Sequence, residues 1–413
     1  MEATNPDGSS RWAGRRPEEA DGPRVGVLLW DDACEPSSLS GMPGNMGEAL
    51  RRAGCELLPI MVGPLGSAPV FRSAAAAAPR DVPRRLYRTA RRAMEAGLPG
   101  LVRGRCERRA LASARLAARR ARDAGVDVVF GPCMSRPLAY LEDGLPVVYA
   151  SDATASLLLG TYDDYRRRGR GWREAMIDLE TRAFGRADRI ALASDRTAQS
   201  AVEDHGADWD RISIVPLGAN IAPDGISPGE PEPPSPGDLR LLLSAADPER
   251  KRLGLCVDIA AELRSRGWRA TLHYIGPERP ECSRPEVEWA GRLSLGDPED
   301  SAVHRSLLER CHLAILPSVA EMFGIAPIES AAFGRPAVVS DAGGLPTVVE
   351  DGVTGRVIPV DTPLAGWVDA IESTCARPDR YLDFSRAARA RFESTLNWDA
   401  WGRSLRRLIE QVA

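Results

Sequence analysis

The sequence predicts two α/β domains, each built on a parallel sheet, and three observations support this. Its 413 residues exceed the usual size of a single hydrophobic core. Short β-branched runs alternate with amphipathic stretches between residues 24 and 218, and the same rhythm restarts after residue 238. Between the two series lies ISPGEPEPPSPG, residues 226–237, whose prolines prevent helix and ladder pairing and favour an extended linker.

The first predicted domain spans residues 23–225. Residues 1–22 are polar and lack an apolar core, so we expect a disordered leader and not a signal peptide. The strands of this domain are expected at RVGVLL, CELLPI, VDVVFG, PVVYA, DRIALAS and RISIVPLG.

The second predicted domain spans residues 238–385, with strands at LRLLLSA, TLHYIG, HLAILP, PAVVS and RVIPV. A helix is expected from Leu253, because apolar residues recur there at helical spacing. Residues from about 381 to 413 read as helix carrying Trp398 and Trp401, and 386–413 are expected to pack back on the first domain. Two such Rossmann-like domains would face a central cleft where ligands bind.

Bulk composition excludes several classes of protein. Apolar residues make up 43% and charged residues 27% of the chain, and no apolar run is long enough to span a bilayer. A net charge of −4 does not indicate a nucleic-acid partner. The eight cysteines form no C-x-x-C pair, which favours a reducing, cytoplasmic location.

Lysine occurs once, at Lys251, among 54 basic residues. It lies in SAADPERKRLG, between the strand LRLLLS and the helix from Leu253. Basic residues at a strand end can neutralise a diphosphate, and a departing nucleotide requires this as charge builds on its oxygens. Arg250 and Lys251 are therefore candidate phosphate-binding residues. The alternative is that RKR is a solvated charge run.

Two strand-to-helix turns follow the strand HLAILP. The first contains Glu321 and leads into a short helix with Pro327 in its first turn and Glu329 near its start. Ionised carboxylates only accept hydrogen bonds, so this pair can bind sugar and ribose hydroxyls. The second turn contains Gly343 and Gly344, where the backbone can approach a ligand and bind an anion. Either turn could instead be an ordinary βα connection.

The segment E-x-F-G-x-x-x-x-E-x-x-x-x-G-x-P, together with GGLPTVVEDGVTG, resembles the E-x7-E signature of retaining GT-B glycosyltransferases, especially glycosyltransferase family 4. The likeness covers most of residues 24–405. It implies that Glu321 contacts the transferred sugar and Glu329 the nucleoside ribose. It also implies that amides around Phe323, Gly324 and Ile325 hold sugar or phosphate oxygens.

The same resemblance implies roles for the two basic residues and for two residues of the first domain. Arg250 and Lys251 resemble the family's R-K pair, whereas Ala245 stands where relatives often carry a further arginine. Gly41, before a helix, is the candidate for close approach to the donor diphosphate or the acceptor. Asp152, in PVVYASDATASLL, replaces a histidine that contacts the donor sugar in many relatives. Its carboxylate could accept from a hydroxyl or assist the acceptor, or it could cap a helix beginning at Ala153.

No metal site is expected. None of the four histidines has metal-ligand spacing; all four are interpreted as structural, His304 on a surface helix. Asp208-Trp209-Asp210 spells D-x-D but precedes RISIVPLG as an ordinary helix-to-strand turn.

An arginine-rich segment spans residues 80–122, with fourteen arginines against three acidic residues. It could dock an anionic acceptor, a membrane surface or a partner. The alternative is a solvated helical face.

Together these features predict a hexosyltransferase-type enzyme. It would move a sugar from a nucleotide-diphosphate sugar to an acceptor hydroxyl without an obligatory cofactor or metal, and the resemblance implies retention of configuration. Alternatives with the same fold are a sugar phosphorylase, a nucleotide-sugar epimerase, a pseudo-glycosyltransferase or a degenerate non-enzymatic protein.

Overall fold

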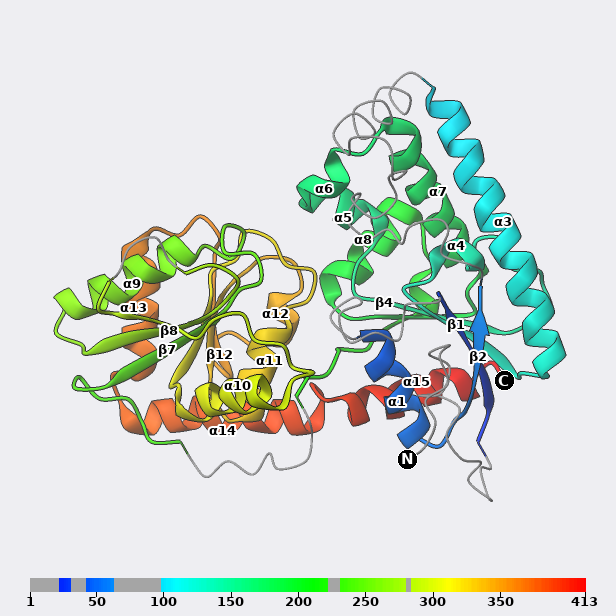
Figure 1. Ribbon diagram of the computed structural model, residues 1–413. Coiled ribbons are helices and arrows are strands. Elements are labelled where there is room, and N and C mark those ends of the chain that lie inside the picture. Colours follow the sequence, from blue (N-terminus) through cyan, green and yellow to red (C-terminus); the bar gives the residue numbers. More distant parts are fainter. Residues whose placement is uncertain (1–21, 31–41, 63–97, 222–230, 280–283) are drawn as a thin grey trace. The chain divides into compact units, whose positions relative to one another are not determined.

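The computed structural model describes residues 22–30, 42–62, 98–221, 231–279 and 284–413 (Figure 1). The chain divides into two compact units. Unit 1 comprises Met1–Val215 and Trp401–Ala413, and unit 2 comprises Pro216–Ala400. The division after Val215 comes before the predicted linker at 226–237, whose first five residues lie outside the described ranges.

Unit 1 is built on a six-stranded parallel sheet in the order β2-β1-β3-β4-β5-β6. Each strand coincides with a run expected from the sequence. The strands are β1 (Arg24–Leu29), β2 (Glu56–Met61), β3 (Val128–Pro132), β4 (Val147–Ser151), β5 (Arg189–Leu192) and β6 (Ile212–Ile214). Strands β3 and β4 are buried along their whole length, as expected for a parallel sheet covered by helices.

Helices connect and cover this sheet. They are α1 (Met42–Arg52), α3 (Pro99–Ala124), α4 (Ser135–Leu138), α5 (Ala155–Thr161), α6 (Asp163–Arg166), α7 (Arg170–Arg186) and α8 (Asp195–His205). The long helix α3 packs against α4 and α7 and buries a stripe of alanines at helical spacing. Small side chains there allow close helix contact.

Unit 2 is also built on a six-stranded parallel sheet, in the order β12-β11-β10-β7-β8-β9. Its strands are β7 (Leu239–Ser244), β8 (Ala270–Ile275), β9 (Val287–Trp289), β10 (Leu313–Leu316), β11 (Ala337–Ser340) and β12 (Gly355–Ile358). The sequence pattern misses β9, because this edge strand has three residues and is mostly exposed, so it lacks an apolar run.

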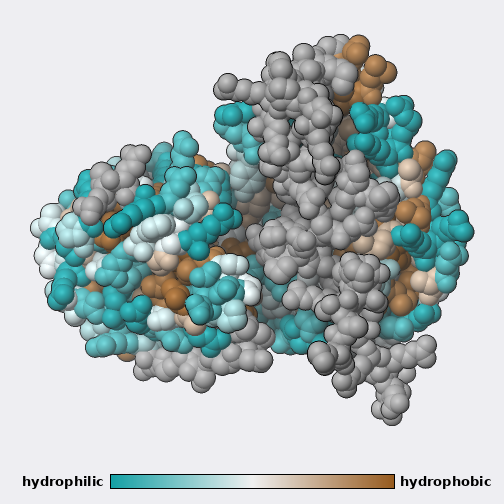
Figure 2. Space-filling model, viewed as in Figure 1, coloured by the Kyte–Doolittle hydropathy of each residue, from teal (hydrophilic) through white to brown (hydrophobic). Residues whose placement is uncertain are grey.

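The helices of unit 2 are α9 (Leu253–Ser265), α10 (Pro298–Arg310), α11 (Ile325–Ala332), α12 (Leu345–Val348), α13 (Leu364–Cys375) and α14 (Pro378–Ser394). Helix α9 begins at Leu253 as predicted and packs against β8 and α13, whereas α10 and α11 pack against β7 and β10. Hydrophilic side chains predominate on the visible face of this unit (Figure 2).

The C-terminal segment forms two helices, so the prediction of one continuous helix is wrong. Helix α14 ends at Ser394 and α15 spans Trp398–Glu410. Asn397 causes the break: its Nδ2 donates to the carbonyls of Phe392 and Glu393, and its Oδ1 accepts from the Ala400 amide at 2.8 Å. The side chain thus binds the end of one helix and caps the next.

Helix α15 packs on the first sheet, as predicted. The Trp401 side chain is buried, with its ring centroid 6.2 Å from that of Phe130 in β3. Arg406 Nη1 donates to the Ala53 carbonyl at 2.5 Å, and Gly402 allows the helix to approach the Ala49 backbone. The last residues of the chain therefore complete unit 1.

Each sheet has one point where the strand order reverses. In unit 2 the chain runs outward from β7 to β8 and β9, then returns to β10 on the other side of β7. The adjacent connections diverge there, and in parallel α/β sheets the carboxyl ends at such a point are where ligands bind. In unit 1 the reversal lies between β1 and β3. Within the described part of the chain, no helix is long and apolar enough to cross a membrane.

Candidate functional site

The candidate site lies at the carboxyl ends of β7 and β10 in unit 2. These two strands are hydrogen-bonded neighbours. The turn after β7 carries Arg250 and Lys251, and the turn after β10 carries Glu321, so the parallel register brings together residues far apart in the chain.

Glu321 is the centre of this cluster. Its Oε1 lies 2.9 Å from Arg250 Nη1 and 3.6 Å from Lys251 Nζ. The Ser318 hydroxyl donates to the same oxygen at 3.0 Å. The Glu321 residue is 8% exposed. Two cations and a hydroxyl therefore converge on one buried carboxylate oxygen.

Further contacts hold the two basic residues at the strand end. Lys251 Nζ donates to the Ser244 carbonyl at 3.2 Å, at the last residue of β7. The Arg250 amide donates to Asp247 at 3.1 Å, and the Arg250 carbonyl accepts from the Val319 amide at 3.0 Å. Ala245, where relatives often carry an arginine, is fully buried and adds no charge.

Gly324 starts the helix that carries the second glutamate. It has φ of 104°, and a Cβ there would lie 2.5 Å from a methyl group of Leu345. A side chain at this position would therefore be both strained and crowded. Phe323 is buried, and Ile325 is the first residue of α11. The first amides of a helix have no intrahelical acceptors. Binding of sugar or phosphate oxygens by the amides around Phe323, Gly324 and Ile325 stays a prediction.

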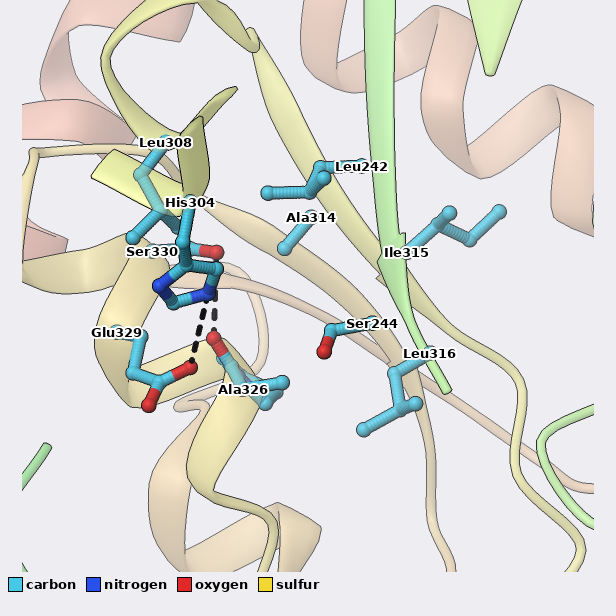
Figure 3. Close-up of a pocket in the computed structure, with 11 residues that line it drawn as sticks. Leu242, Ser244, His304, Leu308, Ala314, Ile315, Leu316, Ala326, Glu329 and Ser330 are labelled. Atoms are coloured by element: carbon cyan, nitrogen blue, oxygen red, sulfur yellow. Dashed lines mark hydrogen bonds and ion pairs between the residues drawn. The ribbon is translucent and has the colours of Figure 1, made fainter. Parts of the chain in front are cut away.

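Glu329 lies on α11 with its side chain buried (Figure 3). Its Oε2 is 3.6 Å from Nε2 of His304, and it also accepts a backbone hydrogen bond from Asn220. Burial raises the pKa of Glu329 to about 7, although the Lys251 charge and the Asn220 hydrogen bond act in the opposite direction.

His304 was expected on a surface helix, and that expectation is wrong. It lies on α10 as predicted, but its side chain is buried and faces Glu329 (Figure 3). The reason is the position of His304 three and four residues before Leu307 and Leu308, which places all three on the buried face of α10. The helical spacing of His304 from these two leucines could have indicated from the sequence that His304 is buried.

Gly343 has a structural role in the same region. Its φ is 57°, and a Cβ there would lie 1.6 Å from the Glu321 carbonyl oxygen. The turn after β11 therefore packs directly on the turn that carries Glu321. Ser340 Oγ strengthens this link by donating to the Ser318 carbonyl at 2.6 Å. Anion binding by Gly343 and Gly344 remains a prediction.

In unit 1, Asp152 follows β4, and burial raises its pKa to about 6. The alternative that Asp152 caps a helix beginning at Ala153 is wrong. Thr154 is the cap of α5, and its Oγ1 accepts from the Leu157 amide at 3.1 Å. Gly41, the other candidate in this unit, lies outside the described residues.

The sequence interpretation missed Glu180, a buried residue of α7. Its Oε1 accepts from the Tyr149 hydroxyl at 2.7 Å, and its Oε2 accepts from the Ala155 amide. Glu180 thereby links β4 to the start of α5 through hydrogen bonds. Burial raises the pKa of Glu180 to about 7. Glu180 lies four residues after Met176, on the buried face of α7. This helical spacing could have indicated from the sequence that Glu180 is buried.

Asp208 and Asp210 lie at the turn expected from the sequence. Asp208 caps the 3-10 helix Trp209–Arg211, with Oδ1 accepting from the Asp210 amide at 3.0 Å. Arg211 Nε is 3.6 Å from Asp208 Oδ2. The described residues contain no group of three or more His, Cys, Asp or Glu side chains that could hold a metal.

Only part of the arginine-rich segment 80–122 is described, and it forms most of α3. Several of its arginines make ion pairs: Arg103 with Glu107 and Asp178, and Arg122 with Glu142. The helix thus presents a polar outer face opposite its alanine stripe.

Comparison with known proteins agrees with this architecture. Residues 239–377, which hold the Arg250, Lys251, Glu321 and Glu329 cluster, match a family model described as "Glycosyl transferases group 1". A sucrose-phosphate synthase from Thermosynechococcus elongatus superimposes with a TM-score of 0.62 at 15% identity, covering 94% of this chain and 98% of that one. HepE from Anabaena, solved with UDP and glucose, gives 0.56 at 14% identity, covering 94% and 99%. The chain has the two-domain, Rossmann-like GT-B fold.

Curated relatives are more similar in sequence but match over a shorter range. The D-inositol 3-phosphate glycosyltransferase of Nocardia farcinica is 30% identical over 224 residues, 49% of this chain and 48% of the relative. That of Gordonia bronchialis is 28% identical over 239 residues, 53% and 51% respectively. The chain spans about half the length of these relatives.

Proposed function

We propose that the protein is a glycosyltransferase that uses a nucleotide-diphosphate sugar as donor and transfers the sugar to an acceptor hydroxyl. The observation that carries this proposal is the convergence of Arg250 and Lys251 on Glu321 where the strand order of unit 2 reverses, with Glu329 on the next helix. Cations and hydroxyl-binding carboxylates occur together there, and a nucleotide sugar combines a diphosphate with sugar and ribose hydroxyls.

Each group has a defined task in this proposal. Arg250 and Lys251 carry several N–H donors each, so they can bind a diphosphate while still contacting Glu321. They stabilise the negative charge that grows on the departing diphosphate. Glu321 accepts a hydrogen bond from the transferred sugar, and Glu329 accepts from the ribose. The first amides of α11, around Phe323, Gly324 and Ile325, bind sugar or phosphate oxygens.

We also propose retention of the anomeric configuration, with the acceptor hydroxyl approaching the face that the diphosphate leaves. Asp152 would contact the sugar or the acceptor, and Gly41 would allow close approach of donor or acceptor. No obligatory metal or other cofactor is required, since Arg250 and Lys251 supply positive charge. The anomeric coupling constant of the product in proton NMR tests retention.

The first experiment is calorimetric binding of UDP-, GDP-, ADP- and TDP-glucose. A single neutral substitution, Glu329→Gln, should weaken binding of the selected donor about tenfold to hundredfold, the value of a lost charge-assisted hydrogen bond. Glu299→Gln, an exposed acid in the first turn of α10, is the matched control. Unchanged affinity in Glu329→Gln would show that the site is assigned wrongly.

Product analysis with the selected donor separates the alternatives. A transferase needs an acceptor, and inositol phosphate is the first to try because of the names of the curated relatives. An epimerase would change the nucleotide sugar without an acceptor, and a phosphorylase would consume inorganic phosphate. Donor binding without any conversion would favour a pseudo-glycosyltransferase or a non-enzymatic protein.

Contact of the arginine-rich segment with an anionic surface is a separate proposal. It rests on the exposed arginines of α3 and on the charge of residues 80–122. Cosedimentation with vesicles containing phosphatidylserine should then weaken as salt rises. Absence of binding at low salt would identify the segment as a solvated face.

A further inference from the structure

His304 and Glu329 lie beside each other in the wall of a small cavity inside unit 2 (Figure 3). The two residues come from different helices, α10 and α11, and their nearest atoms, His304 Nε2 and Glu329 Oε2, are 3.6 Å apart. A shift of about half an ångström would bring them to hydrogen-bond distance. Their side chains are only 5% and 8% exposed.

The walls of this cavity are almost free of charge. Strands β7 and β10 contribute Leu242, Ser244, Ala314, Ile315 and Leu316, α10 contributes Leu308, and α11 contributes Ala326, Pro327 and Ser330. Lys251 is the charged group that acts on Glu329, from the turn before α9, and the Asn220 amide supplies a hydrogen bond. Burial alone acts on the pKa of His304.

An uncharged enclosure makes charge on either residue costly unless the other compensates. Burial raises the pKa of Glu329 to about 7 and lowers the pKa of His304 to about 4. Between these values the pair therefore holds one proton, which lies on Glu329 in the ligand-free protein. A protonated carboxyl is a donor at one oxygen and accepts hydrogen bonds from ribose hydroxyls more weakly than a carboxylate does.

We infer that His304 is a positioning residue that keeps Glu329 able to bind ribose below neutral pH by taking over the proton of the pair. When a ribose hydroxyl donates to Glu329, the proton moves from a Glu329 oxygen to Nε2 of His304. Glu329 then accepts as a carboxylate, and the imidazolium forms an ion pair with it. No proton leaves the pair. The attraction between imidazolium and carboxylate at this short distance in a buried site raises the proton affinity of His304 and offsets the gap between the two pKa values. This inference rests on the proposed function for the role of Glu329.

The first test uses the ligand-free protein and does not depend on that function. The chain has four histidines, so His304→Gln assigns the His304 ring signals in long-range nitrogen–proton NMR spectra. We expect Nε2 of His304 to change its chemical shift around pH 7, when Glu329 takes up the proton and hydrogen-bonds to it. Glu329→Gln should abolish this transition. A wild-type His304 signal that stays constant between pH 8 and pH 5 would overturn the inference.

The second test measures proton transfer on donor binding. Calorimetry with the glucose nucleotide selected above, UDP-glucose being tried first, is repeated at pH 6 in buffers of different ionisation enthalpy. These phosphodiesters do not titrate near pH 6, so released protons come from the protein. Wild type should release almost none, whereas His304→Gln should release about one, because Glu329 must then lose its proton to solvent.

The pH dependence of donor affinity also distinguishes wild type from His304→Gln. Between pH 7.5 and pH 5.5 the His304→Gln variant should lose about 25-fold in donor affinity, since a carboxyl of pKa about 7 is mostly ionised at pH 7.5 and mostly protonated at pH 5.5. Wild type should lose less than about threefold. His273→Gln, another buried histidine of unit 2, near Glu288, is the matched control and should behave as wild type.

The outcomes separate the two proposals. If no nucleotide sugar binds, the proposed function fails, and the NMR transition alone decides whether His304 and Glu329 share a proton. If donors bind and His304→Gln keeps the pH profile and proton count of wild type, His304 is only a packing residue and the inference is wrong.

Discussion

Arg250 Nη1 lies 2.9 Å from Glu321 Oε1, although the two residues are 71 positions apart in the chain. The pair exists because β7 and β10 are neighbours in the sheet while their connections lead to different helices. Lys251 joins it at 3.6 Å. The cluster therefore combines a preformed positive charge with a hydroxyl acceptor, and several consequences can be measured.

Replacement of Lys251 should weaken donor binding in a graded way. Lys251→Met removes a charged donor, so affinity for the selected nucleotide sugar should fall about tenfold to hundredfold. Lys251→Arg keeps the charge, but a planar guanidinium cannot occupy the position of Nζ between the Ser244 carbonyl and Glu321, so it should restore binding only in part. Calorimetry measures both, with Arg310→Met on the exposed end of α10 as control.

Substitution of Gly343 should damage the site through the backbone. In Gly343→Ala the new Cβ would collide with the Glu321 carbonyl, so the two turns must separate, and both thermal stability and donor affinity should fall. Gly352→Ala is the matched control, because Gly352 also has positive φ, 75°, but no atom lies near its would-be Cβ. It should cost about 1–2 kcal/mol of backbone strain and leave donor affinity unchanged. Equal donor affinity in the two variants would contradict the packing argument.

The contribution of Glu180 to the free energy of unfolding should decrease as pH rises from 6.5 to 8. Burial raises the folded-state pKa of Glu180 to about 7, above that of an ordinary carboxyl, so the folded protein binds this proton more tightly than the unfolded chain. The resulting stability is present at low pH and is lost as pH rises through 7. The raised pKa of Glu329 acts in the same direction. The lowered pKa values of His304 and His312, each about 4, act in the opposite direction up to about pH 7.5, because the imidazoles of the unfolded chain titrate near pH 6.5.

Glu180→Gln tests this linkage. With a folded-state pKa of about 7, wild-type Glu180 should lower the free energy of unfolding by roughly 0.5–1 kcal/mol between pH 6.5 and pH 8. Urea unfolding at the two pH values should therefore show that wild type loses more unfolding free energy from pH 6.5 to pH 8 than Glu180→Gln does, by about this amount. A pH dependence as large as that of wild type would assign the effect to other groups.

Loss of the Trp401 side chain should destabilise unit 1. Trp401 is 2% exposed and packs against Phe130, so Trp401→Ala should cost about 3–5 kcal/mol. Trp209→Ala, at a residue that is 55% exposed in the same unit, should change stability by less than about 0.5 kcal/mol. Denaturant unfolding followed by circular dichroism measures both, and similar losses in the two variants would argue against the packing of α15.

The order of elements could be predicted from the sequence because it depends on local patterns. The buried strands show as β-branched runs, Leu253 begins α9 as expected, and Pro327 lies in the first turn of α11. The candidate residues Arg250, Lys251, Glu321 and Glu329 were recognised by type and spacing, since one lysine and an E-x7-E pattern are visible without a structure. Strand β9 was not predicted, because its three mostly exposed edge residues show no hydrophobic periodicity.

The partners of those residues were decided by tertiary structure. Arg250 reaches Glu321 only because β7 and β10 are neighbours, and His304 reaches Glu329 only because α10 and α11 pack together. No local pattern encodes those two distances. Thr154 caps α5 in place of Asp152 because capping depends on the backbone angles at the helix start. The sequence by itself thus determined which chemical groups the candidate site contains. Packing decided which of them meet and how burial changes their charge.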